Sequence, residues 1–237
     1  MFDIKVDEAA ITEEKDTLGN GGSFKLDSGV YDMTISEVYA KESSGGAIGL
    51  HVTFSDKNSK KSFNETYYLT NRNKQNTYVD KKTKEKKTLP GFNQGNTISL
   101  LAAGKPIVDA IKSVEKKTIQ LYSFEAGKKV NTEVEMVMDL LNKEITVGVI
   151  KQIVNKRTKQ GNEYVPIAET REENIADKFF RATDKRTVTE ISAESPAKFV
   201  NEWSDNWTGD IRDKTDKSLK AETTESDNTP TKSLFED

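Results

Sequence analysis

The residues of this chain that suit a specific chemistry are basic side chains interleaved with aromatic ones. Residues 71–87 (NRNKQNTYVDKKTKEKK) hold seven basic and two acidic residues, a local charge of +5. The run follows Tyr67 and Tyr68, contains Tyr78 and is soon followed by Phe92. Basic side chains attract phosphates, and unpaired bases stack on flat rings without any sequence code. The pattern indicates a surface for single-stranded nucleic acid, with a solvated loop as the plainer alternative.

A second basic segment extends from Lys151 to Lys159 and precedes Tyr164. Two basic hairpins on one small domain could flank a groove, and the equal alternative is a pair of solubilising turns. The residues that we expect to contact nucleic acid are His51, Tyr68, Arg72, Lys74, Tyr78, Lys81, Lys82, Lys84, Lys86, Lys87, Phe92, Lys151, Lys156, Arg157, Lys159 and Tyr164.

The composition removes most of the residues on which enzymes depend. The 237 residues include no cysteine and a single histidine, His51. Disulfides, thiolate zinc sites and cysteine nucleophiles are therefore excluded, and paired-histidine metal sites are excluded as well. No phosphate-binding glycine loop or nucleophile-elbow motif occurs. We expect no catalytic residues, no cofactor and no metal, although a carboxylate-only magnesium site, as in nucleases, stays open as an alternative.

Three strands must position the first group of residues. VYDMTISEVYA, AIGLHVTF and SFNETYYL each alternate apolar and polar residues, and short polar turns separate them. The pattern predicts an antiparallel meander. Parity places Tyr67 in the core, together with Tyr39 of the first strand, and leaves His51 and Tyr68 on the outer face.

The remaining elements follow from the same patterns. Pro90-Gly91 is expected to stop regular structure, and residues 95–112 have helical spacing that breaks near Gly104 and Pro106. Further strands are predicted at 117–124, 132–139 and 145–154, and a turn then leads into EYVPIAETR. Within 172–207, IADKFF and SPAKFVNEW each offer an apolar helical face, and Ser195-Pro196 fits a helix start.

The two ends of the chain are acidic. Residues 1–28 carry −4 and residues 208–237 carry −3, which leaves +4 on the body between them. From 221 to 237 there are five acids, one lysine and two large apolar residues, too few to offset the entropy of ordering. We expect a disordered tail that serves for solubility, competes for the basic groove, or docks a partner through Leu234, Phe235, Glu236 and Asp237.

Membrane segments are not expected. No run of about 18 apolar residues occurs. The acidic start, MFDIKVDEAAITEEKD, has neither a basic n-region nor an apolar h-region. The expectation is a cytoplasmic protein with no membrane partner.

The layout resembles a known class. A meander (GVYDMTISEVYAKESSGGAIGLHVTF), the TNRNK…LPGF segment, a helical connection, further strands and an acidic tail resemble bacteriophage single-stranded-DNA-binding proteins of the OB-fold type. One departure is that Glu236 and Asp237 follow Phe235, whereas such tails usually finish on the aromatic residue.

This resemblance implies a mainly β, OB-fold-like five-stranded barrel with helical additions and a disordered acidic C-terminal tail. It implies an N-terminal arm (1–28), a nucleic-acid-binding domain (29–170), a helical elaboration (171–207) and a disordered tail (208–237). The implied function is sequence-tolerant coating of single-stranded DNA in phage replication, recombination or transcription, in the host cytoplasm. The tail would recruit a DNA or RNA polymerase. The alternatives are a single-strand-binding transcription cofactor and a magnesium-dependent nuclease, and a homo-oligomer is compatible with each.

Overall fold

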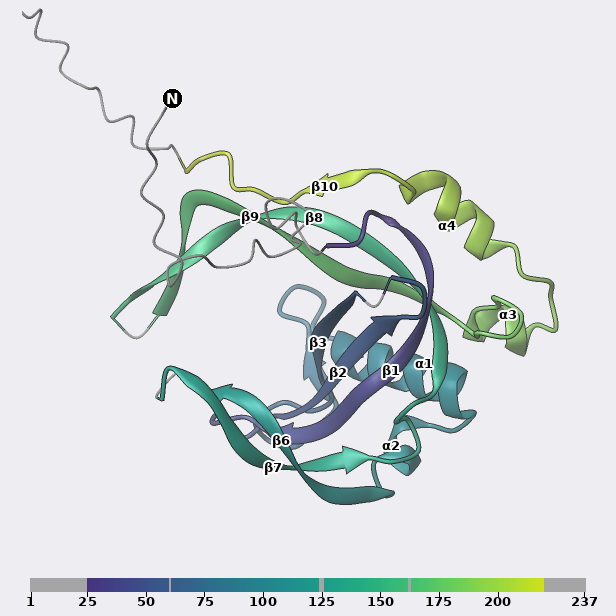
Figure 1. The fold of residues 1–237 in the computed structure, drawn as a ribbon, viewed down its shortest axis with the longest axis horizontal. Helices are drawn as coiled ribbons and strands as arrows, with labels where there is room; N and C mark the ends of the chain where they lie inside the picture. The colour runs from purple at the N-terminus through teal and green to yellow at the C-terminus, as the bar shows by residue number, and fades with distance from the viewer. Residues whose placement is uncertain (1–24, 60, 124–125, 162, 220–237) are drawn as a thin grey trace, which may run out of the picture.

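The computed structural model describes residues 25–59, 61–123, 126–161 and 163–219. These residues form a mainly β structure with four helices, drawn in Figure 1. The strands are β1 (Gly29–Glu42), β2 (Ile48–Asp56), β3 (Ser62–Tyr68), β4 (Thr77–Val79), β5 (Lys86–Thr88), β6 (Val114–Ser123), β7 (Lys128–Val137), β8 (Glu144–Gln160), β9 (Glu163–Phe180) and β10 (Ile211–Asp213). The helices are α1 (Pro90–Ala103), α2 (Ile107–Ala110), α3 (Val188–Ser192) and α4 (Phe199–Trp207).

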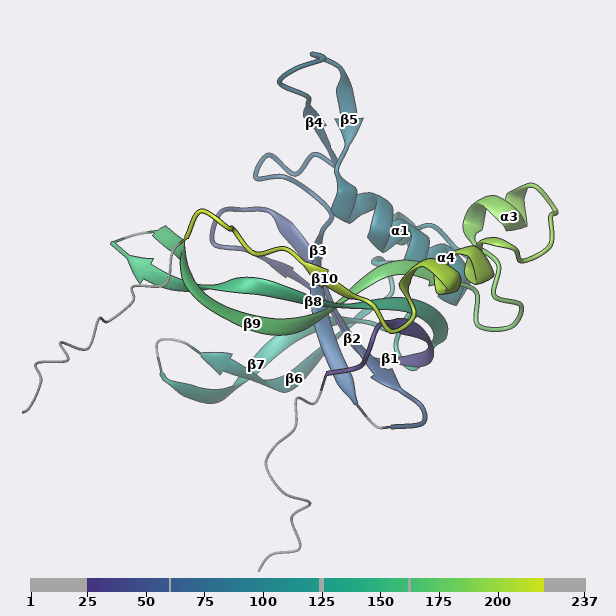
Figure 2. The same ribbon diagram turned by 90° about the horizontal axis from the view of Figure 1, so that it is seen from above.

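One long strand, β1, organises the eight-stranded sheet. The sheet runs β10–β8–β1–β2–β3, with β9 paired to β8 and β7 paired to both β1 and β6. Along the edge opposite β2, β1 pairs first with β8 (29–34) and then with β7 at Tyr39 and Ala40. The long hairpins β6–β7 and β8–β9 therefore start from the same edge of β1, and both extend toward one end of the molecule (Figures 1 and 2).

The predicted meander is confirmed, because β1, β2 and β3 pair in sequence and antiparallel. In β2 and β3 the predicted parity also holds. Leu50, Val52 and Phe54 are buried in the core, and Tyr67 is buried while Tyr68 is exposed. The sequence pattern therefore sets the register of these two strands.

The described strands do not close into the OB-fold-like five-stranded barrel that was expected. Among the described residues no backbone ladder joins β3 to β9, although these two strands lie against each other. One side chain bridges the seam, since Glu65 Oε1 accepts a hydrogen bond of 2.6 Å from Ala176 N. The sheet is also larger than expected, because β6, β7 and β10 join it.

Helix α1 closes one end of the sheet. It begins at Pro90, where we expected regular structure to stop, because proline is well suited to the first helical turn. A Cβ on Gly91 would lie 2.6 Å from the backbone N and O of Tyr68, so only glycine lets the helix start against β3. The predicted break is confirmed, with a left-handed Gly104 (φ 69°) ending α1 before α2.

The predicted helix at IADKFF is wrong, because β9 continues through this segment to Phe180. Phe179 faces the main core, whereas Phe180 packs with Ile150 and Trp203 on the other side. A strand buried on both faces loses its alternation and can resemble a helix in sequence. The helix predicted in SPAKFVNEW is confirmed as α4, although it begins at Phe199, after Ser195-Pro196.

Two expected boundaries also need correction. Residue 170 lies inside β9, so no element ends where the binding domain was expected to end. Residues 208–219 were assigned to the disordered tail, yet β10 pairs in parallel with β8 at 151–153. At the other end, Leu26 of the expected arm is buried in the core.

Some expectations lie outside the described residues, namely residues 1–24 of the arm and the tail from 220, with Leu234, Phe235, Glu236 and Asp237. Within the described ranges, none of the helices has the length and apolar character needed to cross a membrane.

Candidate nucleic-acid interface

Three rings, one from each strand of the meander, share the outer face of the sheet. Tyr39 on β1 pairs across the ladder with His51 on β2, which pairs with Thr66 on β3. The rings of Tyr39 and His51 are stacked, with centroids 4.7 Å apart and planes 9° apart. Tyr68 lies two residues along from Thr66 on the same face and is 51% exposed. We call Tyr39, His51 and Tyr68 the ring strip.

Gly49 forms the floor of the ring strip between His51 and Tyr68. It pairs directly with Tyr68. A Cβ built on Gly49 would lie 3.6 Å from both Tyr68 Cε1 and His51 Nε2, and 3.0 Å from Thr66 Cγ2. Gly49 is itself buried, so the side chains of Thr66, His51 and Tyr68 close over it, and a larger residue would push them apart.

His51 is held in place and kept neutral. Its Nδ1 shares a hydrogen bond of 2.9 Å with Thr66 Oγ1, which fixes the ring orientation. Burial, with a smaller effect from nearby Lys41, lowers the pKa of His51 below the usual value for histidine. The imidazole is therefore uncharged at neutral pH, as suits a stacked ring.

The rest of this face is small and polar. Thr53 and Ser55 follow His51 at alternate positions of β2 and share its face. Ser36 of β1 lies over them, with its Oγ 2.7 Å from Ser55 Oγ and 3.3 Å from the carbonyl oxygen of Thr53. Of the three rings, Tyr68 is exposed and His51 is half-buried, whereas Tyr39 is buried.

A curled hairpin forms one side of the ring strip. Tyr39 packs against Val134 and Met136 of β7, and Ile119 and Leu121 of β6 pack on the same cluster while keeping part of their surface exposed. The strip thus has a partly exposed apolar wall beside it.

The lysine-rich run forms a separate two-stranded arm, β4–β5. Figure 2 shows this arm projecting away from the main sheet. Lys81, Lys82, Lys84 and Lys86 are exposed along it. Lys87 is partly neutralised, since its Nζ lies 3.0 Å from Asp80 Oδ2 and 3.7 Å from Glu85 Oε2.

The base of the arm lies next to the β1–β2 turn. The carbonyl oxygen of Arg72 would lie 3.3 Å from a Cβ on Gly46 of that turn, and Lys74 forms an ion pair of 2.6 Å with Glu42. Arg72 is exposed, and Tyr78 on the arm is 38% exposed. The arm therefore begins beside the end of β3 that carries Tyr68.

Phe92 does not join the ring strip, contrary to the grouping drawn from the sequence. It packs on the main core and lines a hollow of about 340 Å³ with Ile48, Leu69 and residues of α2. Phe92 lies beside Leu69, which is buried in the core, whereas Tyr68 faces outward. The rings of Phe92 and Tyr68 therefore lie on different faces of the sheet.

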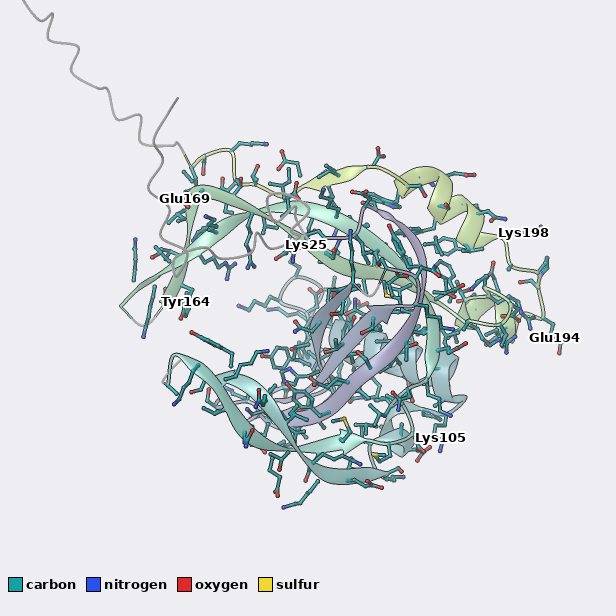
Figure 3. All side chains as sticks on the ribbon, viewed as in Figure 1. Lys25, Lys105, Tyr164, Glu169, Glu194 and Lys198 are labelled. Atoms are coloured by element: carbon teal, nitrogen blue, oxygen red, sulfur yellow. The ribbon has the colours of Figure 1, made fainter. Side chains whose placement is uncertain are left out.

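In the β8–β9 hairpin, two of the basic residues that we expected to contact nucleic acid, Lys151 and Lys156, form ion pairs. The Lys151 side chain is largely covered, and its Nζ lies 3.3 Å from Glu172 Oε2 and 3.6 Å from Asp27 Oδ1. Its charge therefore takes part in structural ion pairs. Lys156 pairs with Glu169 at 2.8 Å. Arg157, Lys159 and Tyr164 are exposed, and Figure 3 shows Tyr164 near the far end of the hairpin.

Tyr39 is buried, as its shared parity with Met33 and Ile35 indicates, but it packs with Val134 and Met136 of β7 and not in the main core, and its stack on His51 was not predicted. The cause is a bulge in β1, where the register with β2 shifts between Ile35 and Glu37. An extra residue reverses the side-chain parity beyond it. Gly49 was assigned to the outer face but not recognised as the floor between two rings, and no feature of the sequence marks it.

The described residues contain no group of three or more His, Asp or Glu side chains placed to hold a metal ion. Comparison with known proteins adds no assignment, since no family model and no curated protein matches the chain.

Proposed function

We propose that this protein binds single-stranded DNA without sequence preference, through the ring strip on the outer face of β1–β2–β3. The observation that supports this most directly is the exposed ring of Tyr68 beside the half-buried ring of His51, which the buried Tyr39 supports by stacking on it. Aromatic rings on a sheet bind the faces of unpaired bases, and each stacked base contributes about 1–3 kcal/mol. In a duplex these faces are covered by neighbouring base pairs, so the strip favours single strands.

Basic side chains supply the second part of the proposed site. Lys81, Lys82, Lys84 and Lys86 are exposed on the arm that starts next to Tyr68. Phosphates neutralised by such lysines give affinity without sequence information. Stacking and phosphate contacts together account for binding that tolerates any sequence.

The fold is proposed to be an enlarged OB-fold variant. Strands β1, β2, β3, β8 and β9 follow the pairing order β3–β2–β1–β8–β9, and β9 returns to lie against β3. Helix α1 lies between the third and fourth of these strands in sequence. The arm β4–β5, the hairpin β6–β7 and strand β10 are then additions to a five-stranded plan that binds oligonucleotides on the face of its second and third strands.

The resemblance to phage proteins extends the proposal to a biological role. The protein would coat single strands during phage replication, recombination or transcription in the host cytoplasm. Its acidic C-terminal segment, with Leu234 and Phe235, would recruit a DNA or RNA polymerase.

A change that pushes the rings of the strip apart tests the proposal. Gly49→Val adds a branched side chain between His51 and Tyr68 and removes no charge, so affinity for a labelled oligothymidylate should fall by tenfold or more. Gly45→Val is the matched control, since a Cβ on Gly45 would contact only Ser43 Oγ, at 3.9 Å.

Thermal melts should show both variants folded, and Gly49→Ala serves as the milder change if valine perturbs the strand. Equal affinity of the folded Gly49 variant and the Gly45 control would refute the ring strip as the binding site.

A further inference from the structure

A hollow lies away from the ring strip, between the β8–β9 hairpin and the segment that follows β10. Its volume is about 790 Å³, within the range of about 300–1,000 Å³ typical of small-molecule sites. Arg157, Tyr164, Pro166, Arg171 and Lys214 line it, together with Lys156. The full lining has four basic residues and two acidic ones, Glu173 and Asp216.

The hollow is held in shape by backbone and side-chain contacts. Asn155 bridges its two walls, because its Nδ2 donates to the carbonyl oxygen of Ile167 at 2.8 Å and its Oδ1 accepts from Asp216 N at 2.6 Å. The backbone N of Lys214 donates to the carbonyl oxygen of Ile153 at 2.9 Å. The β8–β9 register shifts between Asn155 and Arg157, so a bulge lies at the hollow.

Among the residues that the structure describes, two of the four basic side chains have no acidic partner. Lys156 pairs with Glu169, and Arg171 lies 2.9 Å from Glu173 Oε2. No carboxylate of the residues that the structure describes lies within 4 Å of the charged groups of Arg157 or Lys214. Two cations on opposite walls of one hollow are suited to bind phosphate oxygens.

The hollow also offers a ring. Tyr164 is 59% exposed, and Pro166 follows it on the same face of β9, opposite Arg157. An exposed tyrosine beside a proline gives an apolar surface of the size of a base, next to the cations that would hold its phosphate.

A chain of neighbouring residues connects this hollow to the ring strip. Glu173 lines both the hollow and a smaller one of about 350 Å³ at the seam between β3 and β9. Thr66, which is hydrogen-bonded to His51, lines that smaller hollow. One extended strand could therefore follow the surface from the ring strip across the seam to Tyr164.

We infer that the hollow between the β8–β9 hairpin and residues 214–216 is a second nucleotide-binding subsite. Tyr164 stacks on a base, and Arg157 and Lys214 bind the flanking phosphates. The inference rests on the proposed function, because the ligand is a further part of the single strand that the ring strip binds. The ring strip suffices for a short oligonucleotide, and only a longer one reaches both sites.

Affinities for two lengths of oligothymidylate test this, one of about 4 and one of about 16 nucleotides, the span of known site sizes. Tyr164→Ala should weaken binding of the long oligomer by about 5- to 150-fold, as expected for one stacked base, and leave the short one unchanged. Lys214→Ala should weaken only the long oligomer and reduce its log–log salt slope by about 0.7. Lys198→Ala is the charge control, since Figure 3 shows Lys198 on the opposite side of the molecule from Tyr164. An unchanged affinity of Tyr164→Ala for the long oligomer, or an equal loss for both lengths, would overturn the inference.

Photocrosslinking of the wild-type protein separates this inference from the proposed function. A 16-nucleotide oligomer that carries 5-iodouracil should crosslink to both Tyr164 and Tyr68, as mapped by mass spectrometry. Crosslinks at Tyr68 without any at Tyr164 would overturn the second subsite alone. Crosslinks at Tyr164 without any at Tyr68 or His51 would overturn the ring strip and retain the hollow.

Discussion

Adjacent tyrosines at the end of β3 should respond to the same substitution in opposite ways. Tyr67 is 3% exposed and packs edge-on against Phe179, with ring centroids 6.2 Å apart, whereas Tyr68 is 51% exposed over Gly49. Removal of a buried ring costs about 3–5 kcal/mol, through lost burial and the cavity left behind. Tyr67→Ala should therefore reduce the free energy of unfolding by that amount, which is a large part of the total for a domain.

Tyr68→Ala should leave stability within about 0.5 kcal/mol of wild type, as for most surface changes. It should instead lose one stacking surface, which is about 1–3 kcal/mol of binding free energy, or roughly 5- to 150-fold in Kd. Urea unfolding monitored by circular dichroism gives the stability, and anisotropy of a labelled oligothymidylate gives Kd. The reasoning is refuted if Tyr68→Ala is the destabilised variant, or if it binds as tightly as wild type.

Three further predictions follow from the arm, the seam and the α4 contact. Replacing the exposed Lys81, Lys82, Lys84 and Lys86 with alanine should weaken binding to all sequences alike and flatten the salt dependence, and an unchanged slope would show that the arm does not touch phosphates. Burial raises the pKa of Glu65 above its usual value, so its ionisation opposes folding near neutral pH, and the protonated form is tolerated best. Glu65→Gln should therefore raise the melting temperature at pH 7, with a gain that shrinks as pH falls through the raised pKa of the folded state and is gone below the ordinary carboxyl value of 4.5; a gain independent of pH would contradict this. A Cβ on Gly148 would lie 3.0 Å from three atoms of the buried Trp203 ring, so Gly148→Ala should destabilise the protein by about 1–3 kcal/mol in urea unfolding, and a neutral result would mean that α4 does not pack there.

The meander and its outer-face residues could be predicted because alternation along a half-buried strand is a local signal. His51 and Tyr68 follow directly from it. Tyr39 does not, since a single bulged residue between Ile35 and Glu37 reverses the parity and leaves no mark in composition. The ring strip was thus predicted without the ring that stacks on His51.

The later elements depend on contacts that a local pattern cannot show. The end of β9 is buried on both faces, by the core and by α4, so its apolar residues follow no period of two. Strand β10 is polar and short, and it is ordered by pairing with β8, more than fifty residues earlier in the chain. The hollow next to Tyr164 depends on this long-range pairing, which explains why Arg171 and Lys214 were not predicted to belong to it.

The central claim is that unpaired bases stack on the ring strip, and a direct comparison of single and double strands tests it best. One labelled oligonucleotide would be titrated with the protein alone and after annealing to its complement, at the same salt concentration. A single stacked base should make the single strand bind about 5- to 150-fold tighter than the duplex, and Tyr68→Ala should reduce this ratio. Equal affinities for the two forms would contradict stacking and leave only attraction of phosphates to basic side chains.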